Sequence, residues 1–267
     1  VVGPLAGALV YGLGGGRNGG ITWVLGLNAV SFGAVVAALS TITIRQRERS
    51  RSPILAAIVE GFRFVRSDPG LRVTAQALCL NTLFVAPFIG LIPAMVEKEL
   101  GGEQTAVSFL IGGQGLGAVL TGVAFGRLST RFGVRRVLVT ALAGGPVALI
   151  LYALSPSPAV AVAPLVLTGA FYFAVLSSIT TTASLRAPSE LRGRVLSLNQ
   201  VILGAVYAVS LNVEGQLGDR FGLRQVTIGG AVLCLLVLVV AAVVRPGSTE
   251  VLDDAPVSDG ARPQPRR

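Results

Sequence analysis

The chain has 267 residues, of which 52% are hydrophobic and only 13% are charged, and its mean hydropathy is +0.73. A soluble domain carries about 25% charged residues, so this composition indicates an integral membrane protein in a lipid bilayer. The net charge of +9 could suggest a nucleic-acid partner. The arginines, however, lie in loops between apolar segments, where anchoring at a membrane face explains them more simply. Because the sequence contains no histidine, histidine–metal sites and Ser-His-Asp catalysis are excluded. We expect no enzyme, no cofactor and no nucleic-acid partner.

Eight apolar segments predict an all-α membrane protein with about eight transmembrane helices. The first, residues 1–16, is short: 16 residues rise about 24 Å, against a hydrocarbon core of about 30 Å. We therefore expect the native chain to begin upstream of Val1. The other seven spans are predicted at about residues 21–44, 73–96, 105–128, 137–154, 160–185, 195–216 and 225–244.

A long polar stretch separates the second and third spans. Ser52 and Pro53 are typical of a helix start, and apolar residues then recur at helical spacing until Asp68-Pro69-Gly70. This pattern predicts an amphipathic helix on the inner membrane surface, with packing on a partner protein as the alternative. Residues 245–267 show no periodicity, which predicts a disordered tail.

The loop charges predict the orientation of the spans. If the spans alternate, eighteen of the 22 basic residues lie on one side of the membrane. Cytoplasmic loops carry the excess of lysine and arginine, so this side is expected to be cytoplasmic. The sequence therefore predicts a multi-pass protein of the plasma (inner) membrane with a cytoplasmic C-terminus.

A short arginine-rich turn after the fourth span recurs after the seventh. The frame Gly-x-Leu-x-x-Arg-Phe-Gly-x-Arg-x-Val fits both residues 126–137 and residues 215–226. The two copies are three spans apart and therefore face opposite sides of the membrane. This spacing favours two three-helix units of opposite orientation, with chance recurrence of a short pattern as the alternative.

Several motifs resemble those of the major facilitator superfamily of secondary transporters. Residues 60–69 and 191–195 resemble loops of the subgroup that includes the enterobactin exporter. The run Gly3-Pro4-Leu5-Ala6-Gly7 resembles the helix-five motif of proton-driven exporters, whose positions are matched by Gly3, Pro4 and Gly7. The superfamily's cytoplasmic loop motif is matched by Gly126, Arg127, Arg131, Gly133, Arg135 and Arg136, although Thr130 stands where an acidic residue is usual.

The resemblance implies a major facilitator fold that lacks its first four helices, so that the eight spans correspond to helices five to twelve. Residues 1–44 would end the N-terminal half, 45–72 would form a cytoplasmic linker, 73–244 a six-helix C-terminal half-bundle, and 245–267 the tail. It also implies secondary active transport, with proton-coupled export of small amphipathic, drug-like or siderophore-like molecules. The missing helices of the same protein would be a partner. The alternative is a truncated, non-transporting remnant or a partner-dependent helix bundle.

Uncharged polar residues within the spans are the candidates for contact with a substrate: Asn81, Gln114, Tyr172, Ser177, Gln200 and Tyr207. Gln200 and Tyr207 are two helical turns apart and share a face. Amides and hydroxyls in an apolar cavity suit amphipathic organic molecules, while the same groups can also join helices to one another. Glu214 is the one acidic residue placed within a span, where both a proton-titrating role and an interfacial position fit it.

Glycine and proline predict two further features of the spans. The run Gly113-Gln114-Gly115-Leu116-Gly117 lies within a span, which favours close helix packing over a nucleotide site. Bends are predicted at four prolines: Pro87, Pro93, Pro146 and Pro164.

Overall fold

The computed structural model describes residues 19–41 and 54–253, which contain helices and no β-strand. The chain divides into two compact units, Val1–Pro53 and Ile54–Arg267. In the first unit the structure describes α2, Gly19–Ser40, and the predicted limit of its span at residue 44 lies outside the described residues. The hydroxyl of Ser40 donates to the carbonyl of Ala37 at 2.7 Å, within the last turn. The predicted span 1–16, with Gly3, Pro4 and Gly7, lies outside the described residues.

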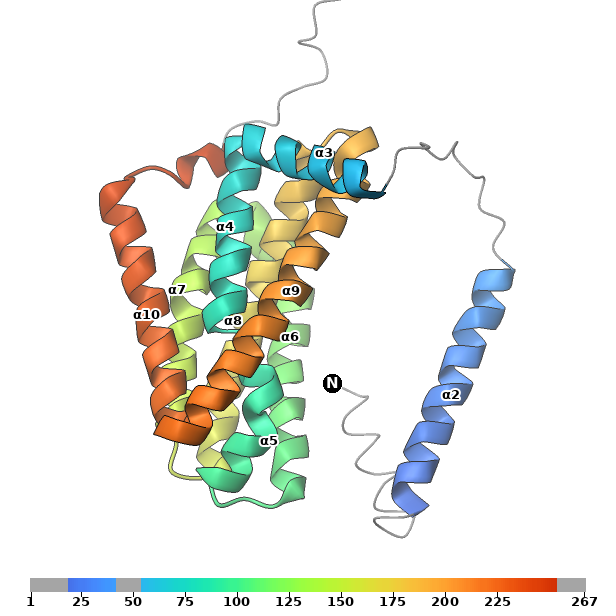
Figure 1. The fold of residues 1–267 in the computed structure, drawn as a ribbon, viewed down its shortest axis with the longest axis vertical. Helices are drawn as coiled ribbons and strands as arrows, with labels where there is room; N and C mark the ends of the chain where they lie inside the picture. The colour runs from blue at the N-terminus through green and yellow to red at the C-terminus, as the bar shows by residue number, and fades with distance from the viewer. Residues whose placement is uncertain (1–18, 42–53, 254–267) are drawn as a thin grey trace, which may run out of the picture. The chain divides into compact units, whose positions relative to one another are not determined.

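The second unit is a helical bundle that accounts for the predicted spans from the third to the eighth. Six of its segments are long and apolar enough to cross a membrane, and α4 and α5 together form one of them, Pro69–Lys98. The helices are α3 (Ile54–Ser67), α4 (Pro69–Phe84), α5 (Phe88–Lys98), α6 (Gln104–Phe132), α7 (Val134–Ala153), α8 (Pro158–Arg186), α9 (Ser189–Phe221) and α10 (Leu223–Val244), followed by the 3-10 helix η1 (Glu250–Leu252) (Figure 1).

Helix α8 packs closely against both α6 and α7. Glycines allow the approach of α6 and α8. A Cβ atom added at Gly117 would lie only 1.8 Å from the carbonyl oxygen of Val166, and one added at Gly169 only 2.0 Å from that of Gln114. The glycine run that begins at Gly113 therefore packs helix on helix, which confirms the prediction.

The span formed by α4 and α5 is interrupted at residues 85–87. The N–H groups of Val85 and Ala86 both donate to the carbonyl of Asn81, at 2.9 and 3.0 Å, and Pro87 has no N–H with which to continue the helix. By contrast, the helix is not interrupted at any of the other three prolines that were predicted to bend spans: Pro93 in α5, Pro146 in α7 and Pro164 in α8.

Helix α3 is the predicted amphipathic helix, and it lies across one end of the bundle (Figure 1). Val65 is buried in a cluster with residues of α4, α8 and α9, whereas Val59 and Phe62 are exposed. Asp68 separates α3 from α4 and accepts a hydrogen bond from the N–H of Leu71 at 2.8 Å. The third span therefore begins at Pro69 and not at Val73, because Asp68 caps a new helix there. The predicted start at Ser52 and Pro53 lies outside the described residues.

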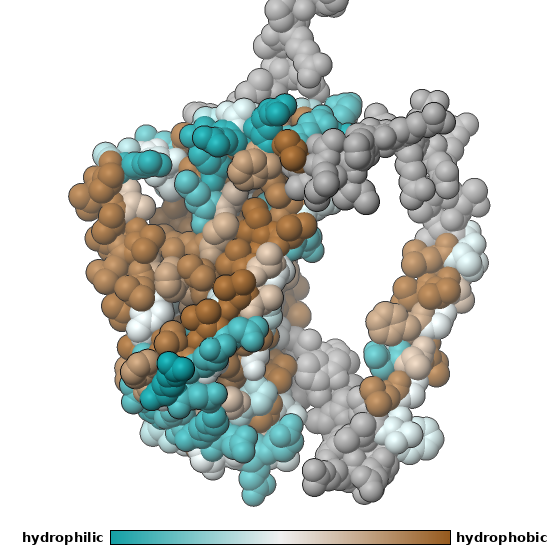
Figure 2. All heavy atoms as spheres, in the orientation of Figure 1, coloured by the Kyte–Doolittle hydropathy of each residue, from teal (hydrophilic) through white to brown (hydrophobic). Residues whose placement is uncertain are grey.

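The outside of this bundle is apolar between two polar ends. Figure 2 shows hydrophobic side chains over the middle of the bundle and hydrophilic ones at both ends. Large apolar side chains such as Val123 and Val243 are 77% and 75% exposed, as suits contact with hydrocarbon. We call the end that carries α3 and the α6–α7 turn the arginine-rich end, and the end that carries the α9–α10 turn the opposite end.

Candidate functional site

Two of the candidate substrate residues come together around α5. The ring of Tyr172 on α8 packs edge-on against Phe88, with centroids 6.3 Å apart and planes at 82°. The hydroxyl of Tyr207 on α9 lies 3.0 Å from the position that a Cβ atom would take at Gly90. Helix α5 therefore brings together two half-buried tyrosines from α8 and α9.

The other four candidates are dispersed over the bundle. Asn81 is buried at the end of α4, and its Nδ2 has no hydrogen-bond partner among the described residues. Gln114 lies at the α6–α8 contact, Ser177 is half-buried on α8, and Gln200 is exposed on α9. The contact of these residues with a substrate stays a prediction.

The two copies of the repeated turn have the same backbone structure. Gly133 joins α6 to α7 with φ 82° and ψ 147°, and Gly222 joins α9 to α10 with φ 88° and ψ 136°. In each copy the glycine N–H donates to the carbonyl four residues earlier, at 3.0 and 2.9 Å. Glycine adopts this region of φ and ψ far more readily than other residues. The repeat predicted from the sequence is therefore present in the backbone, once at each end of the bundle.

At the arginine-rich end, Arg135 binds the segment that follows α10. Its Nη1 lies 2.6 Å from Oδ2 of Asp253, its Nε donates to the hydroxyl of Thr249 at 3.2 Å, and Glu250 is 3.8 Å away. The predicted disorder therefore does not apply to residues 246–253, which form turns and η1. The reason is that charges far away in the sequence hold a segment that has no periodicity of its own. Residues 254–267 lie outside the described part of the chain.

Arg186 joins three elements at the same end. Its Nε donates to Oδ1 of Asp68 at 2.9 Å, in an ion pair whose side chains are 7% and 11% exposed. Its Nη1 donates to the carbonyl of Val251 at 2.9 Å. A Cβ atom at Gly70 would lie 2.4 Å from Nε of Arg186, so a bare glycine backbone makes room for the guanidinium group. Arg186 therefore ties the end of α8 to the start of α4 and to η1.

At the opposite end, Arg224 holds the second copy of the turn. It occupies the repeat position equivalent to Arg135, and its Nη2 donates to the carbonyls of Glu99 and Ser155 at 3.2 and 3.3 Å. The carboxylate of Glu99 accepts a hydrogen bond from the N–H of Leu223 at 3.1 Å. Lys98 pairs with Asp219 at 2.8 Å. The α9–α10 turn is therefore fixed to the ends of α5 and α7.

The remaining residues of the loop motif face outward. Arg127, Arg131 and Arg136 are exposed, and the guanidinium group of Arg131 lies 5.3 Å from the ring centre of Phe132. The hydroxyl of Thr130 donates to the carbonyl of Gly126 at 2.9 Å within its own helix. The acidic partners of this turn are instead supplied by the segment after α10.

Sequence reasoning missed the acidic partners of the loop arginines. Asp68 had been interpreted as a helix stop and as part of a family loop motif, and Asp253 as part of a disordered tail. Glu99 precedes the glycine-rich turn between α5 and α6. An acidic residue next to a helix end is the signal that could have marked each of them, but it does not say which arginine is the partner.

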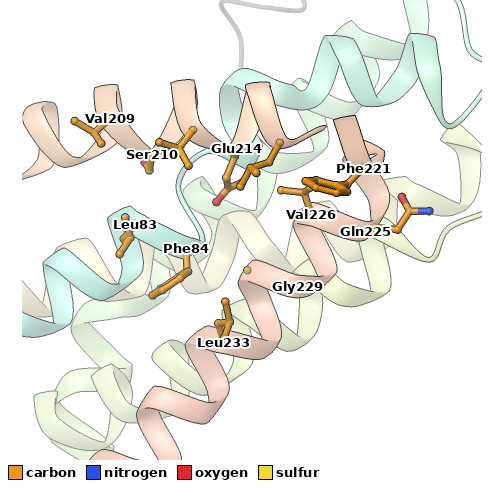
Figure 3. Close-up of a pocket in the computed structure, with 13 residues that line it drawn as sticks. Leu83, Phe84, Val209, Ser210, Glu214, Phe221, Gln225, Val226, Gly229 and Leu233 are labelled. Atoms are coloured by element: carbon orange, nitrogen blue, oxygen red, sulfur yellow. The ribbon is translucent and has the colours of Figure 1, made fainter. Parts of the chain in front are cut away.

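A pocket of about 380 Å³ lies between α4, α9 and α10 (Figure 3). Its wall is almost entirely apolar, and Glu214 is its one charged residue. The sequence had placed Glu214 within a span, and the structure shows that it faces this pocket. The lining residues are Leu83, Phe84, Val209, Ser210, Val213, Glu214, Leu217, Phe221, Gln225, Val226, Gly229, Gly230 and Leu233.

Comparisons with known proteins agree with this arrangement. Residues 2–265 match the family of the major facilitator superfamily described as transmembrane secretion effectors. The chain belongs to this family. The superfamily consists of transporters and is not an enzyme family, so the chain is a multi-pass membrane protein of a transporter family. The family match confirms the resemblance seen in the loop motifs.

An efflux pump and a homologue of a lysosomal transporter are similar to this chain. The multidrug efflux pump Tap of Mycolicibacterium fortuitum is 26% identical over 259 residues, which cover 94% of this chain and 61% of Tap. A bacterial homologue of the human lysosomal transporter Spinster, solved in an inward-facing and unoccupied conformation, is 16% identical with a TM-score of 0.57. The match covers 97% of this chain and 67% of that structure, and it shows a shared fold.

Proposed function

We propose that this secretion-effector family member carries out secondary active transport of small molecules across a membrane by alternating access. The observation that carries the proposal is the pair of glycine turns at opposite ends of one bundle, each fixed by an equivalent arginine. In the major facilitator fold such inverted three-helix repeats are nested within each half, and alternating access comes from rocking one half against the other. Arg135 and Arg224 would keep this half rigid at both ends as it rocks, because each holds a turn to other segments of the same bundle.

We propose export of amphipathic organic molecules, driven by the proton gradient. Tyr172 and Tyr207 offer hydroxyls and aromatic faces in an apolar interior, and Asn81 offers a buried amide whose Nδ2 has no partner among the described residues. Such a mixture suits molecules with a large apolar body and few polar groups. The similarity to an efflux pump supports export, and proton coupling rests on the family resemblance alone. The arginine-rich end would face the cytoplasm.

We further propose that the face of α9 that carries Gln200 contacts additional transmembrane helices. Few of its 33 residues are buried: Val195, Leu198, Ser210 and Gly218. Its exposed residues include the candidate Gln200, and the chain spans 61% of the length of Tap. The same exposed face supports the second candidate function, a helix bundle that works only with a partner.

Dye efflux from energised cells tests transport. The chain is expressed in an efflux-deficient bacterium preloaded with a lipophilic dye, and a protonophore is added to half of each sample. We expect faster efflux than in vector cells, loss of the difference with protonophore, and a several-fold slower rate for Tyr207→Ala. Gln216→Ala, an exposed polar change on the same helix, serves as the matched control.

The outcome separates the two candidate functions. Efflux at the vector rate, with the chain verified in the membrane, contradicts transport by this chain alone and favours the partner-dependent bundle. Efflux that continues with protonophore contradicts proton coupling and leaves transport itself standing.

A further inference from the structure

The pocket between α4, α9 and α10 combines one carboxylate with an apolar wall. In Figure 3 the side chain of Glu214 projects from α9 toward Phe84 and the neighbouring face of α10. Glu214 has no ion-pair partner among the residues that the structure describes. The tyrosines 172 and 207 do not line this pocket, so it is a different site from their contact around α5.

Two cations of the opposite end are engaged elsewhere. Lys98 pairs with Asp219, and Arg224 binds the carbonyl of Glu99 and lies 3.7 Å from its carboxylate. A carboxylate within a span and among apolar side chains is costly unless a positive charge or a proton compensates it. Arg220, an exposed residue of the same helix, does not line the pocket. A proton on Glu214 or a positively charged ligand would therefore compensate the carboxylate.

The pocket also has room for an organic ligand. Its volume of about 380 Å³ falls within the range of about 300–1,000 Å³ that is usual for small-molecule sites. At Gly229 a Cβ atom would meet nothing within 4 Å, and at Gly230 it would stay 3.6 Å from Oε1 of Glu214. Helix α10 therefore presents bare backbone beside the carboxylate, which leaves space for a ligand head group.

The rim of the pocket belongs to the apolar surface of the bundle. Val209 and Phe221 are 62% and 66% exposed, and Leu233 is 52% exposed. A ligand dissolved in hydrocarbon can therefore reach Glu214 sideways, without entering from either polar end. The rings of Phe84 and Phe221 add aromatic faces, which attract organic cations.

We propose that this pocket is a lateral binding site for an amphipathic organic cation. The positively charged head pairs with the carboxylate of Glu214, and the apolar body fills the space between α4, α9 and α10. The site is entered from the lipid side. Binding here does not depend on transport, so this inference can hold even where the proposed function fails, and the two are tested separately.

Equilibrium binding to the purified chain tests the site. Radiolabelled tetraphenylphosphonium is titrated against the protein in a neutral detergent. We expect saturable binding that Glu214→Gln weakens by about tenfold or more, the ratio that corresponds to loss of one charge-assisted contact. Gly229→Leu, which places a large side chain in the pocket from a position where a Cβ atom meets nothing within 4 Å, should weaken it similarly. Gly204→Leu on α9 is the matched control, because a Cβ atom there also meets nothing within 4 Å and Gly204 does not line the pocket.

Competition decides whether charge is recognised. Decyltrimethylammonium should displace the probe, and neutral decanol should not. Absence of saturable binding to the original chain overturns the proposal, as does equal binding to Glu214→Gln. Loss of binding in Gly229→Leu alone, or equal displacement by decanol, shows an apolar pocket without cation recognition and overturns the assignment of the ligand. Gel filtration of every variant confirms that the bundle is folded.

Discussion

The close approach of α6 and α8 makes Gly117→Ala the most informative single change in this bundle. The new Cβ atom would lie 1.8 Å from the carbonyl oxygen of Val166, whereas ordinary contact begins at 3.4 Å. The two helices must therefore separate locally by about 1.6 Å. The obstructing atom belongs to the backbone, so no rotamer change can relieve the clash. Overpacking costs about 1–3 kcal/mol and occasionally more, and we expect about 3 kcal/mol here.

Thermal unfolding in detergent, followed by fluorescence-detected gel filtration, measures this cost. For a chain of this size, about 3 kcal/mol corresponds to a fall in the unfolding midpoint of about 6–12 °C. Gly126→Ala is the matched control, because it makes the same change in the same helix where a Cβ atom meets nothing within 4 Å. Its midpoint should stay unchanged or rise slightly, since alanine favours the helix over glycine.

A second glycine-to-alanine change tests whether Gly117 and Gly169 belong to the same contact between α6 and α8. Gly169→Ala should be as damaging as Gly117→Ala, because its Cβ atom would lie 2.0 Å from the carbonyl oxygen of Gln114. Once the helices have separated, the second change should cost less than the first, so the double variant should be less destabilised than the sum. A Gly117→Ala midpoint equal to that of Gly126→Ala would refute the reasoning.

Three further predictions concern the turns and ion pairs at the bundle ends. Gly133→Ala should destabilise by about 1–3 kcal/mol through backbone strain alone, because its φ is 82° and open space surrounds the new Cβ; a midpoint equal to that of Gly126→Ala would contradict this. Arg186→Gln and Asp68→Asn should each lower the free energy of unfolding by about 3–5 kcal/mol, because each leaves a buried charge unpaired. In a double-mutant cycle measured by thermal unfolding, the double variant should recover part of this loss. Strictly additive losses would argue against the pairing. Arg135→Gln should make residues 249–253 more accessible to limited proteolysis, with at most about 1 kcal/mol lost per exposed pair, while Arg186 still holds the carbonyl of Val251. The exposed Arg136→Gln should be cleaved like the original chain, and equal cleavage of the two variants would show that Arg135 does not hold η1.

The sequence predicted where helices lie better than where they end. The fourth span was placed at residues 105–128, but α6 continues to Phe132. A span is recognised by its apolar residues, whereas a helix ends where its backbone changes direction. Long arginine side chains such as Arg127 and Arg131 can reach the polar end from a helix that is still continuing. The same holds at the start of α9, which begins at Ser189 and not at Val195.

By itself, the sequence determined the all-helical membrane fold, the arginine-rich turns and the repeat at Gly133 and Gly222. Each of these depends on residues close together in the chain: about 20 apolar residues make a span, and a single glycine permits a turn. Only the tertiary structure decided that Arg186 pairs with Asp68, 118 positions away, and that Arg135 holds a segment after α10. It also decided that Glu214 faces a pocket. Which charged groups pair depends on how the helices rotate and pack against one another, and the hydrophobicity of each segment does not determine this.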